Sequence, residues 1–226
     1  MRLPVVAIIA ASLLSLTVPS AHAETWSAKD RRADVRATPV QLDSPRAADD
    51  CSGPRGHRQR GDKRRDVLGL VVEHTTDAVL LTLSMREVAR HDKSTTYELH
   101  LQTPLGGYAL ALSPINPEGP DSVFFSEEPD YPDPDEIEGC TFVIASAALP
   151  CDGLTGERDS TLDRIVITVP RACLKTPDWV RAAAETHGYS RTTASGRFVV
   201  FSDFWSPAGG RRQGFLPPFG PRVRSS

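Results

Sequence analysis

The fold is decided by the stretch DVLGLVVEHTTDAVLLTLSM, residues 66–85. Two apolar runs of strand length, both rich in branched residues, flank the polar sequence Thr75-Thr76-Asp77. Runs of this kind are typical of β-strands, and a short polar segment between two of them is typical of a turn. Residues 66–85 are therefore expected to form two strands joined by a tight turn.

The same signals recur along the chain. Residues 95–103 place Tyr97, Leu99 and Leu101 on one face and polar residues on the other, and the sequence Pro-Leu-Gly-Gly at 104–107 marks a turn before the next strand. Further strands are expected around 26–40, 108–113, 121–127, 141–149, 164–169 and 197–205. Residues 179–188, WVRAAAETHG, follow a strand and a short loop and are expected to form a strand, with a short alanine-rich helix as the alternative.

This many short strands with so little helix predicts an all-β chain, an antiparallel β-sandwich of jelly-roll or immunoglobulin-like type. We expect a single domain over residues 24–205, with a basic linker at 41–65, an acidic loop at 127–139 and a flexible Gly-, Pro- and Arg-rich tail at 206–226.

The first 23 residues are typical of a secretory signal peptide. Arg2 precedes an apolar run over 3–18, and the run is followed by a small-residue site that ends at Ala23. The run is shorter than the roughly 20 residues that a membrane-spanning helix needs. We therefore expect a secreted, extracellular protein with no stable membrane anchor.

Net charge and cysteine content limit which partners and which covalent cross-links are expected. The net charge of −3 gives no reason to expect nucleic acid as a partner, so the expected partner is an unidentified extracellular or cell-envelope component. The chain has four cysteines, and an even number in an exported protein favours disulfide bonds.

The residue pairing expected in a β-hairpin suggests one disulfide. If the strand at 164–169 is the second arm of a hairpin that turns at 160–163, Cys173 faces a position close to residue 150, which favours a bridge to Cys151. Cys51 and Cys140 would then pair by elimination. A hairpin that turns near residues 153–156 would instead pair Cys140 with Cys173, and the four cysteines allow three connectivities.

The segment Val169–Arg181 carries the pattern V-P-R-x-C-L-x-x-P-x-W-V-R, with Cys151 upstream, and the segment Asp30–Val35 carries D-x-x-x-D-V. In these motifs the chain resembles uncharacterised secreted actinobacterial proteins. The resemblance covers about residues 26–205 and implies a β-sandwich and export, but no activity. This chain departs from the pattern at Lys175, where Gly is usual, and in its acidic loop.

Two sets of acidic residues are candidates for calcium, the only cofactor that the sequence suggests. Aspartates at strand starts hold structural calcium in some carbohydrate-binding sandwiches, and the first set is Asp30, Asp34 and Asp66. The alternative set lies in the acidic loop and consists of Asp130, Asp133, Asp135 and Glu138. Ordinary turn aspartates and a solvated acidic loop are the competing interpretations.

Catalytic motifs are lacking. The sequence holds no G-x-S-x-G, no H-E-x-x-H and no Gly-rich phosphate loop, so no catalytic residue is assigned. Phe204 and Trp205 are candidate binding aromatics, although rings at a sandwich end also close the core. The expected function is an exported, non-catalytic binding or envelope-interaction module, with a secreted hydrolase whose active site is non-sequential as the alternative.

Overall fold

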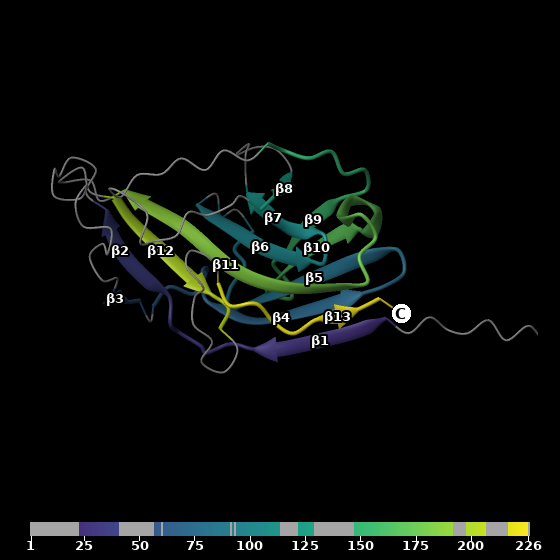
Figure 1. The fold of residues 1–226 in the computed structure, drawn as a ribbon. Helices are drawn as coiled ribbons and strands as arrows, with labels where there is room; N and C mark the ends of the chain where they lie inside the picture. The colour runs from purple at the N-terminus through teal and green to yellow at the C-terminus, as the bar shows by residue number, and fades with distance from the viewer. Residues whose placement is uncertain are drawn as a thin grey trace, which may run out of the picture.

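The computed structural model describes residues 23–40, 57–59, 61–90, 92, 94–113, 122–128, 147–191, 198–206 and 217–225. These residues form two antiparallel sheets that pack face to face, as Figure 1 shows. The predicted antiparallel β-sandwich is therefore confirmed. No described helix is long and apolar enough to cross a membrane.

The first sheet contains the hairpin that the opening stretch predicts. Its order across the sheet is β1 (Glu24–Lys29), β4 (Val67–His74), β5 (Ala78–Met85), β10 (Arg164–Pro170) and β9 (Thr155–Asp159). Between β4 and β5 the Thr75 hydroxyl accepts hydrogen bonds from the backbone N–H groups of Asp77 and Ala78. Such side-chain bonds to the backbone stabilise tight turns.

The second sheet is larger and has eight strands, counting the short β13 (Val223–Arg224), which pairs with β11. The order of its other strands is β3 (His57–Arg58), β2 (Arg36–Val40), β12 (Phe198–Phe204), β11 (Trp179–Arg191), β6 (Thr95–Thr103), β7 (Gly106–Ser113) and β8 (Ser122–Glu127).

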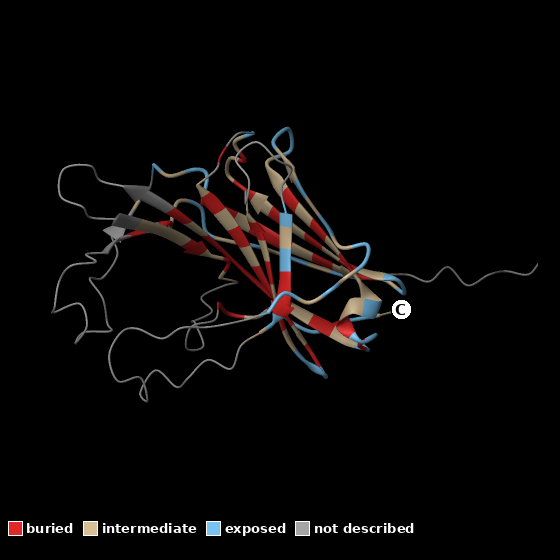
Figure 2. Ribbon diagram, turned by 90° about the horizontal axis from the view of Figure 1, so that it is seen from above, coloured by how far each residue is buried: buried red, intermediate tan, exposed pale blue. Residues whose placement is uncertain are grey.

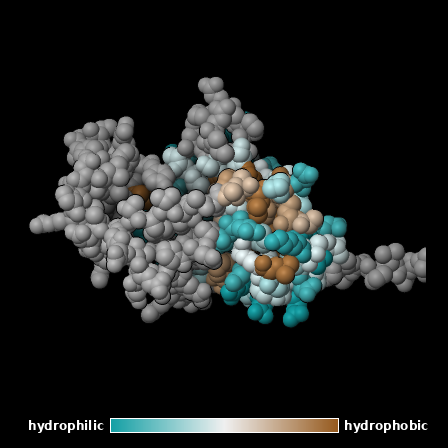
Figure 3. Space-filling model, turned by 45° about the horizontal axis from the view of Figure 1, so that its top comes forward, coloured by the Kyte–Doolittle hydropathy of each residue, from teal (hydrophilic) through white to brown (hydrophobic). Residues whose placement is uncertain are grey.

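The core lies between the two sheets. In Figure 2 buried and half-buried residues alternate along the strands, because successive side chains of a strand point to opposite faces. Leu81 and Leu83 of β5 face Leu99 and Leu101 of β6 within one buried cluster. The surface in Figure 3 mixes hydrophilic atoms with small hydrophobic patches, and the exposed large apolar side chains among the described residues are Leu105, Phe124 and Leu162.

The segment 179–188 is a strand, as predicted, in spite of its alanines. β11 pairs with β6 on one side and with β12 on the other, so its backbone groups are bonded in the sheet. Ala182 and Ala184 face the core. Pairing on both sides outweighs the weak helix preference of alanine.

The predicted disulfide between Cys151 and Cys173 is confirmed, with an S–S distance of 2.02 Å and a Cα–Cα distance of 5.5 Å. β9 and β10 pair in the predicted register, with Arg164 opposite Asp159. A 3₁₀ turn, Arg171–Leu174, follows β10 and brings Cys173 to Cys151. Cys51 and Cys140 lie outside the described residues, as do residues 1–22 of the expected signal peptide.

The expected tail is wrong for residues 217–225. β13 pairs with β11, Val223 is buried, and the backbone N–H of Gly220 donates to Ala182. The ring of Trp26 lies against Gly220, where an added Cβ would come within 2.7 Å of it. A glycine is required at this close approach, so the Gly- and Pro-rich composition reflects packing in the fold.

The expected basic linker is also wrong over residues 57–59 and 61–65. β3 pairs with β2, which adds an edge strand to the second sheet. Arg65 is buried, forms an ion pair with Asp62 at 2.8 Å, and lies over the ring of Phe201 at 5.0 Å. An arginine that is paired and stacked in this way belongs to the folded domain.

Candidate functional site: an aspartate cluster between the sheets

Four aspartates from three distant segments meet where the two sheets join. β1 belongs to the first sheet and β2 to the second, so the connection between them crosses from one sheet to the other and carries Asp30 and Asp34. Asp66 precedes β4, and Asp203 lies in β12. The four residues Asp30, Asp34, Asp66 and Asp203 are called the aspartate site below.

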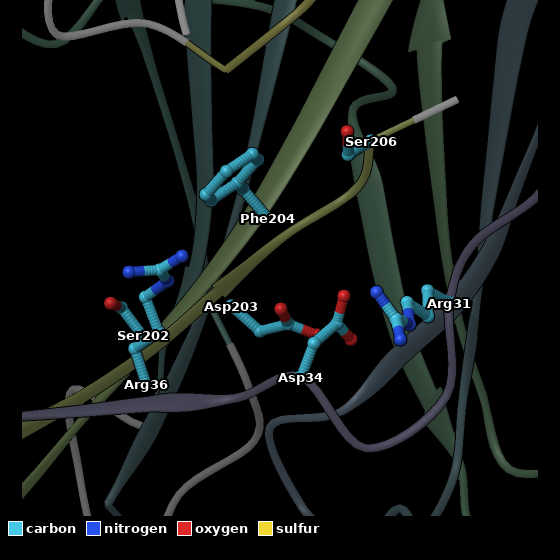
Figure 4. Close-up of a pocket in the computed structure, with 7 residues that line it drawn as sticks. All are labelled: Arg31, Asp34, Arg36, Ser202, Asp203, Phe204 and Ser206. Atoms are coloured by element: carbon cyan, nitrogen blue, oxygen red, sulfur yellow. The ribbon is translucent and has the colours of Figure 1, made fainter. Parts of the chain in front are cut away.

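Three of these carboxylates are close enough to share one ion. Asp34, Asp66 and Asp203 each place an oxygen within 4.8 Å of the others. In Figure 4 the carboxylates of Asp34 and Asp203 point toward one another across the pocket. Oxygen ligands of calcium lie at about 2.3–2.6 Å from the ion, so two ligands of one ion are at most about 5 Å apart. The separations therefore fit a calcium ion.

Asp66 is the fixed member of the site. It is fully buried, and both of its oxygens accept hydrogen bonds of 2.9 Å from the backbone N–H of Ala33. Ala33 has a φ of 64°, a left-handed conformation that a non-glycine residue seldom adopts. Arg86 forms an ion pair with Asp66 at 3.2 Å, so the charge of this carboxylate has a partner.

The negative charge of Asp203 is less well compensated than that of Asp66. It is 4% exposed, and its Oδ2 accepts a hydrogen bond of 2.9 Å from the backbone N–H of Val67. Burial is the main cause that raises the pKa of Asp203 from 3.8 to about 8; the hydrogen bond from Val67 opposes this shift, and the nearby Asp34, Asp30 and Asp66 add to it. The metal-free site therefore holds a proton on Asp203 at neutral pH.

The pKa of Asp30 is raised in the same way. Burial raises the pKa of Asp30 to about 7, against the hydrogen bond that its Oδ1 accepts from the backbone N–H of Arg31 at 2.6 Å. Its Oδ2 is buried, and a hydrogen bond from the backbone of Ser206 also lowers this pKa. Asp30 is not one of the three residues whose oxygens lie within 4.8 Å of one another, and it lies beside them.

A pocket of about 310 Å³ opens onto the site. In Figure 4 Arg31 and Arg36 lie on opposite sides of the acidic pair, and Arg31 is directed toward Asp34. The residues that line the pocket are Arg31, Asp34, Arg36, Ser202, Asp203, Phe204 and Ser206. The pocket therefore combines carboxylates, guanidinium groups, hydroxyls and one aromatic ring.

The predicted calcium set is partly recovered. Asp34 and Asp66 are brought together and Asp30 lies beside them, but Asp203 was missed. An aspartate inside the apolar run FVVFSDFW was the available signal, because a charge in such a strand needs a partner. The alternative set, Asp130, Asp133, Asp135 and Glu138, lies outside the described residues.

The two aromatic residues named as candidates for ligand binding, Phe204 and Trp205, lie in different environments. Phe204 is half-buried and lines the pocket. Trp205 is fully buried and packs edge-to-face on Trp26, with ring centroids 5.1 Å apart. A ring in the core cannot stack on a ligand, so of the two interpretations the one in which the ring closes the core holds for Trp205.

A second polar cluster lies on β6 and β11. His100 contacts Glu128 through Nδ1 at 2.9 Å and Glu185 through Nε2 at 3.3 Å. Burial disfavours the charged imidazole, but the two glutamates outweigh it and raise the pKa of His100 to about 9. The sequence shows only that His100 lies on the polar face of its strand, and does not reveal which strand is its neighbour.

Two of the described histidines, His74 and His100, do not belong to a Ser-His-Asp triad. His100 bonds two glutamates, and the Nδ1 of His74 bonds the backbone oxygen of Val223 at 3.1 Å. Burial lowers the pKa of His74, which keeps it neutral in the core. Neither histidine bonds a serine and an aspartate, the arrangement that a triad requires.

Comparisons with protein-family models, curated proteins and solved structures find no match to this chain. The function is therefore inferred from the geometry of the residues themselves.

Proposed function

We propose that the protein is an exported, disulfide-bonded binding module that holds a calcium ion at the aspartate site. The observation that carries this proposal is the placement of Asp34, Asp66 and Asp203 within 4.8 Å of one another. Hard cations prefer several carboxylate oxygens together, and the three segments involved lie far apart in the sequence.

The electrostatics of the site support a cation. Arg86 compensates Asp66, whereas Asp30 and Asp203 carry pKa values of about 7 and about 8 because burial, and after it the neighbouring carboxylates, disfavour their ionised forms. A divalent ion replaces the protons with two positive charges that all the carboxylates share. It would also join the β1–β2 connection, β4 and β12, and so lock the two sheets together.

The pocket supports a binding role beyond the ion. Asp34 and Asp203 line it together with the ring of Phe204 and the hydroxyls of Ser202 and Ser206. Its volume of about 310 Å³ lies at the lower end for small-molecule sites. A calcium ion there keeps coordination positions open, and the ring offers an apolar surface. We infer a small polar ligand that donates oxygen atoms, as a sugar does.

A secreted hydrolase is the second candidate. The observation that favours it is the pair Asp34 and Asp203, which face one another in a pocket while the pKa of Asp203 is about 8. A carboxyl group that keeps its proton at neutral pH is able to act as a general acid beside a second carboxyl group. In this case activity would not depend on calcium.

Calorimetric titration of the oxidised protein with calcium tests the proposal, together with thermal melts in chelator and in millimolar calcium. We expect one site per chain and a midpoint that rises by several degrees, since a ligand at 100 times its dissociation constant stabilises by about 2.7 kcal/mol. Asp34→Asn should abolish the rise. Asp152→Asn, at an exposed turn position, is the matched control and should keep it.

A wild-type protein that neither binds calcium nor melts later in its presence would overturn the calcium module. Hydrolysis of a polysaccharide in the presence of chelator, lost in the Asp34→Asn variant and kept in the Asp152→Asn variant, would establish the second candidate in its place.

A further inference from the structure

The polar face of the second sheet brings two histidines and two glutamates together. β6 and β11 are neighbours, and Glu98 lies directly opposite Glu185 in their register. His100 and His187 lie two positions further along their own strands, so all four side chains point to the same face. The opposite face of these strands packs in the core. Two paired strands form a rigid base for such a group.

The donor atoms lie at metal-site distances. His100 Nε2 is 3.3 Å from Glu185 Oε1, and His187 Nε2 is 3.4 Å from Glu185 Oε2 and 3.7 Å from Glu98 Oε2. Neighbouring ligands of a tetrahedral zinc ion, with bonds of about 2.0–2.1 Å, are about 3.4 Å apart. Glu98, His100 and Glu185 each offer an atom within 4.8 Å of the others, so small side-chain movements would enclose an ion.

Glu128 gives an independent reason to place a metal at His100 Nε2. Its Oε2 lies 2.9 Å from His100 Nδ1, and its side chain is 10% exposed. Metal-binding histidines characteristically donate their second ring N–H to a carboxylate, which fixes the tautomer and directs the other nitrogen to the ion. In the metal-free protein Nε2 and the Glu185 carboxylate form a hydrogen-bonded pair, so a proton lies between them. A zinc ion bound here would take the place of that proton.

We propose that Glu98, His100 and Glu185 bind a zinc ion, with Glu128 as the positioning residue for His100 and His187 as the positioning residue for the two carboxylates that it contacts. Imidazole nitrogens together with carboxylates suit zinc, whereas calcium prefers an all-oxygen set. The site differs from the aspartate site in its donor atoms, and the two share no residue. It stands whether or not the aspartate site binds calcium.

The test uses the oxidised, metal-free protein, with Zn²⁺ measured by competition against a chromophoric chelator and Co²⁺ as a spectroscopic probe. We expect one ion per chain and the visible absorption of tetrahedral Co²⁺. Glu98→Gln and His187→Gln, both at partly exposed positions, should weaken zinc binding at least 10-fold. Glu128→Gln should weaken it about 10–100-fold.

Two controls separate this site from general effects. Glu157→Gln changes an exposed strand glutamate on β9, and Asp34→Asn disrupts the aspartate site, so both should bind zinc like the wild type. Circular dichroism of each metal-free variant establishes that it is folded. A wild-type protein without stoichiometric zinc, or folded Glu98→Gln and His187→Gln variants that retain wild-type affinity, would overturn the proposal.

Discussion

Replacing Asp203 by asparagine should change stability in opposite directions with and without calcium. Asp203 is 4% exposed and lies beside Asp34 and Asp66. Asparagine keeps an oxygen that accepts the hydrogen bond from the backbone N–H of Val67, but it removes the charge. The variant therefore isolates the electrostatic effect of one carboxylate at nearly constant shape.

In the metal-free protein, the direction of the stability change follows from the pKa of Asp203. Burial and the acidic neighbours raise this pKa from 3.8 to about 8. The folded protein holds a proton that the unfolded chain releases, so stability from this group is complete below pH 4 and is lost as the pH rises toward 8. Each pKa unit corresponds to about 1.4 kcal/mol, and water in the pocket screens part of the cost. We expect Asp203→Asn to gain about 2–3 kcal/mol at pH 9.

Thermal melts in chelator at pH 5 and pH 9 measure this gain, which for a domain of this size is roughly 5–10 °C at pH 9 and much smaller at pH 5. In millimolar calcium the order should reverse, because the wild type gains an ion that the variant has lost. Asp152→Asn should follow the wild type throughout. If Asp203→Asn is less stable than the wild type in chelator at pH 9, the electrostatic reasoning is wrong.

Two further predictions concern stability. Replacing Cys151 and Cys173 together by alanine should lower the free energy of unfolding by about 3 kcal/mol, the loop-closure value for a sequence separation of 22. Denaturant titrations measure this loss, and a loss below about 1 kcal/mol would show that the hairpin is ordered without the bridge. Burial opposes ionisation of Asp92, but hydrogen bonds from Thr95 and Ser94 outweigh it and lower its pKa, so its contribution to stability is present above about pH 4 and lost as the pH falls through the lowered value. Asp92→Asn should therefore destabilise by about 1–3 kcal/mol at pH 7, and an equal effect at pH 3 would contradict this explanation.

Local features were predictable from the sequence because each depends on neighbours along the chain. The strands and turn of residues 66–85 and the β9–β10 register follow from alternation and turn residues alone. The disulfide follows in turn, since hairpin pairing places Cys151 near Cys173. These interactions join residues that are at most about 20 positions apart in the sequence. Over that range, periodicity and turn chemistry leave few alternative pairings.

Contacts between distant segments were not predictable in the same way. Alternation shows that His100 lies on a polar face, but β6 meets β11 only because of the sheet order. Asp203 reaches Asp34 through the pairing of β2 with β12, which no local pattern specifies. The segment around Gly220 was misjudged for the same reason, since Gly220, like the ring of Trp205, packs against Trp26 at the far end of the sequence.

The pairing of the earliest and latest strands has a consequence for how the chain folds as it emerges from the ribosome. β2 pairs with β12, and the backbone N–H of Arg224 bonds the carboxylate of Glu24, where β1 and β13 lie side by side in Figure 1. Neither contact is available until nearly the whole chain has been synthesised. Long-range pairing of this kind is slow, so the nascent chain stays open for most of its synthesis. The same topology leaves early strand edges exposed to chaperones and to aggregation until β12 and β13 arrive.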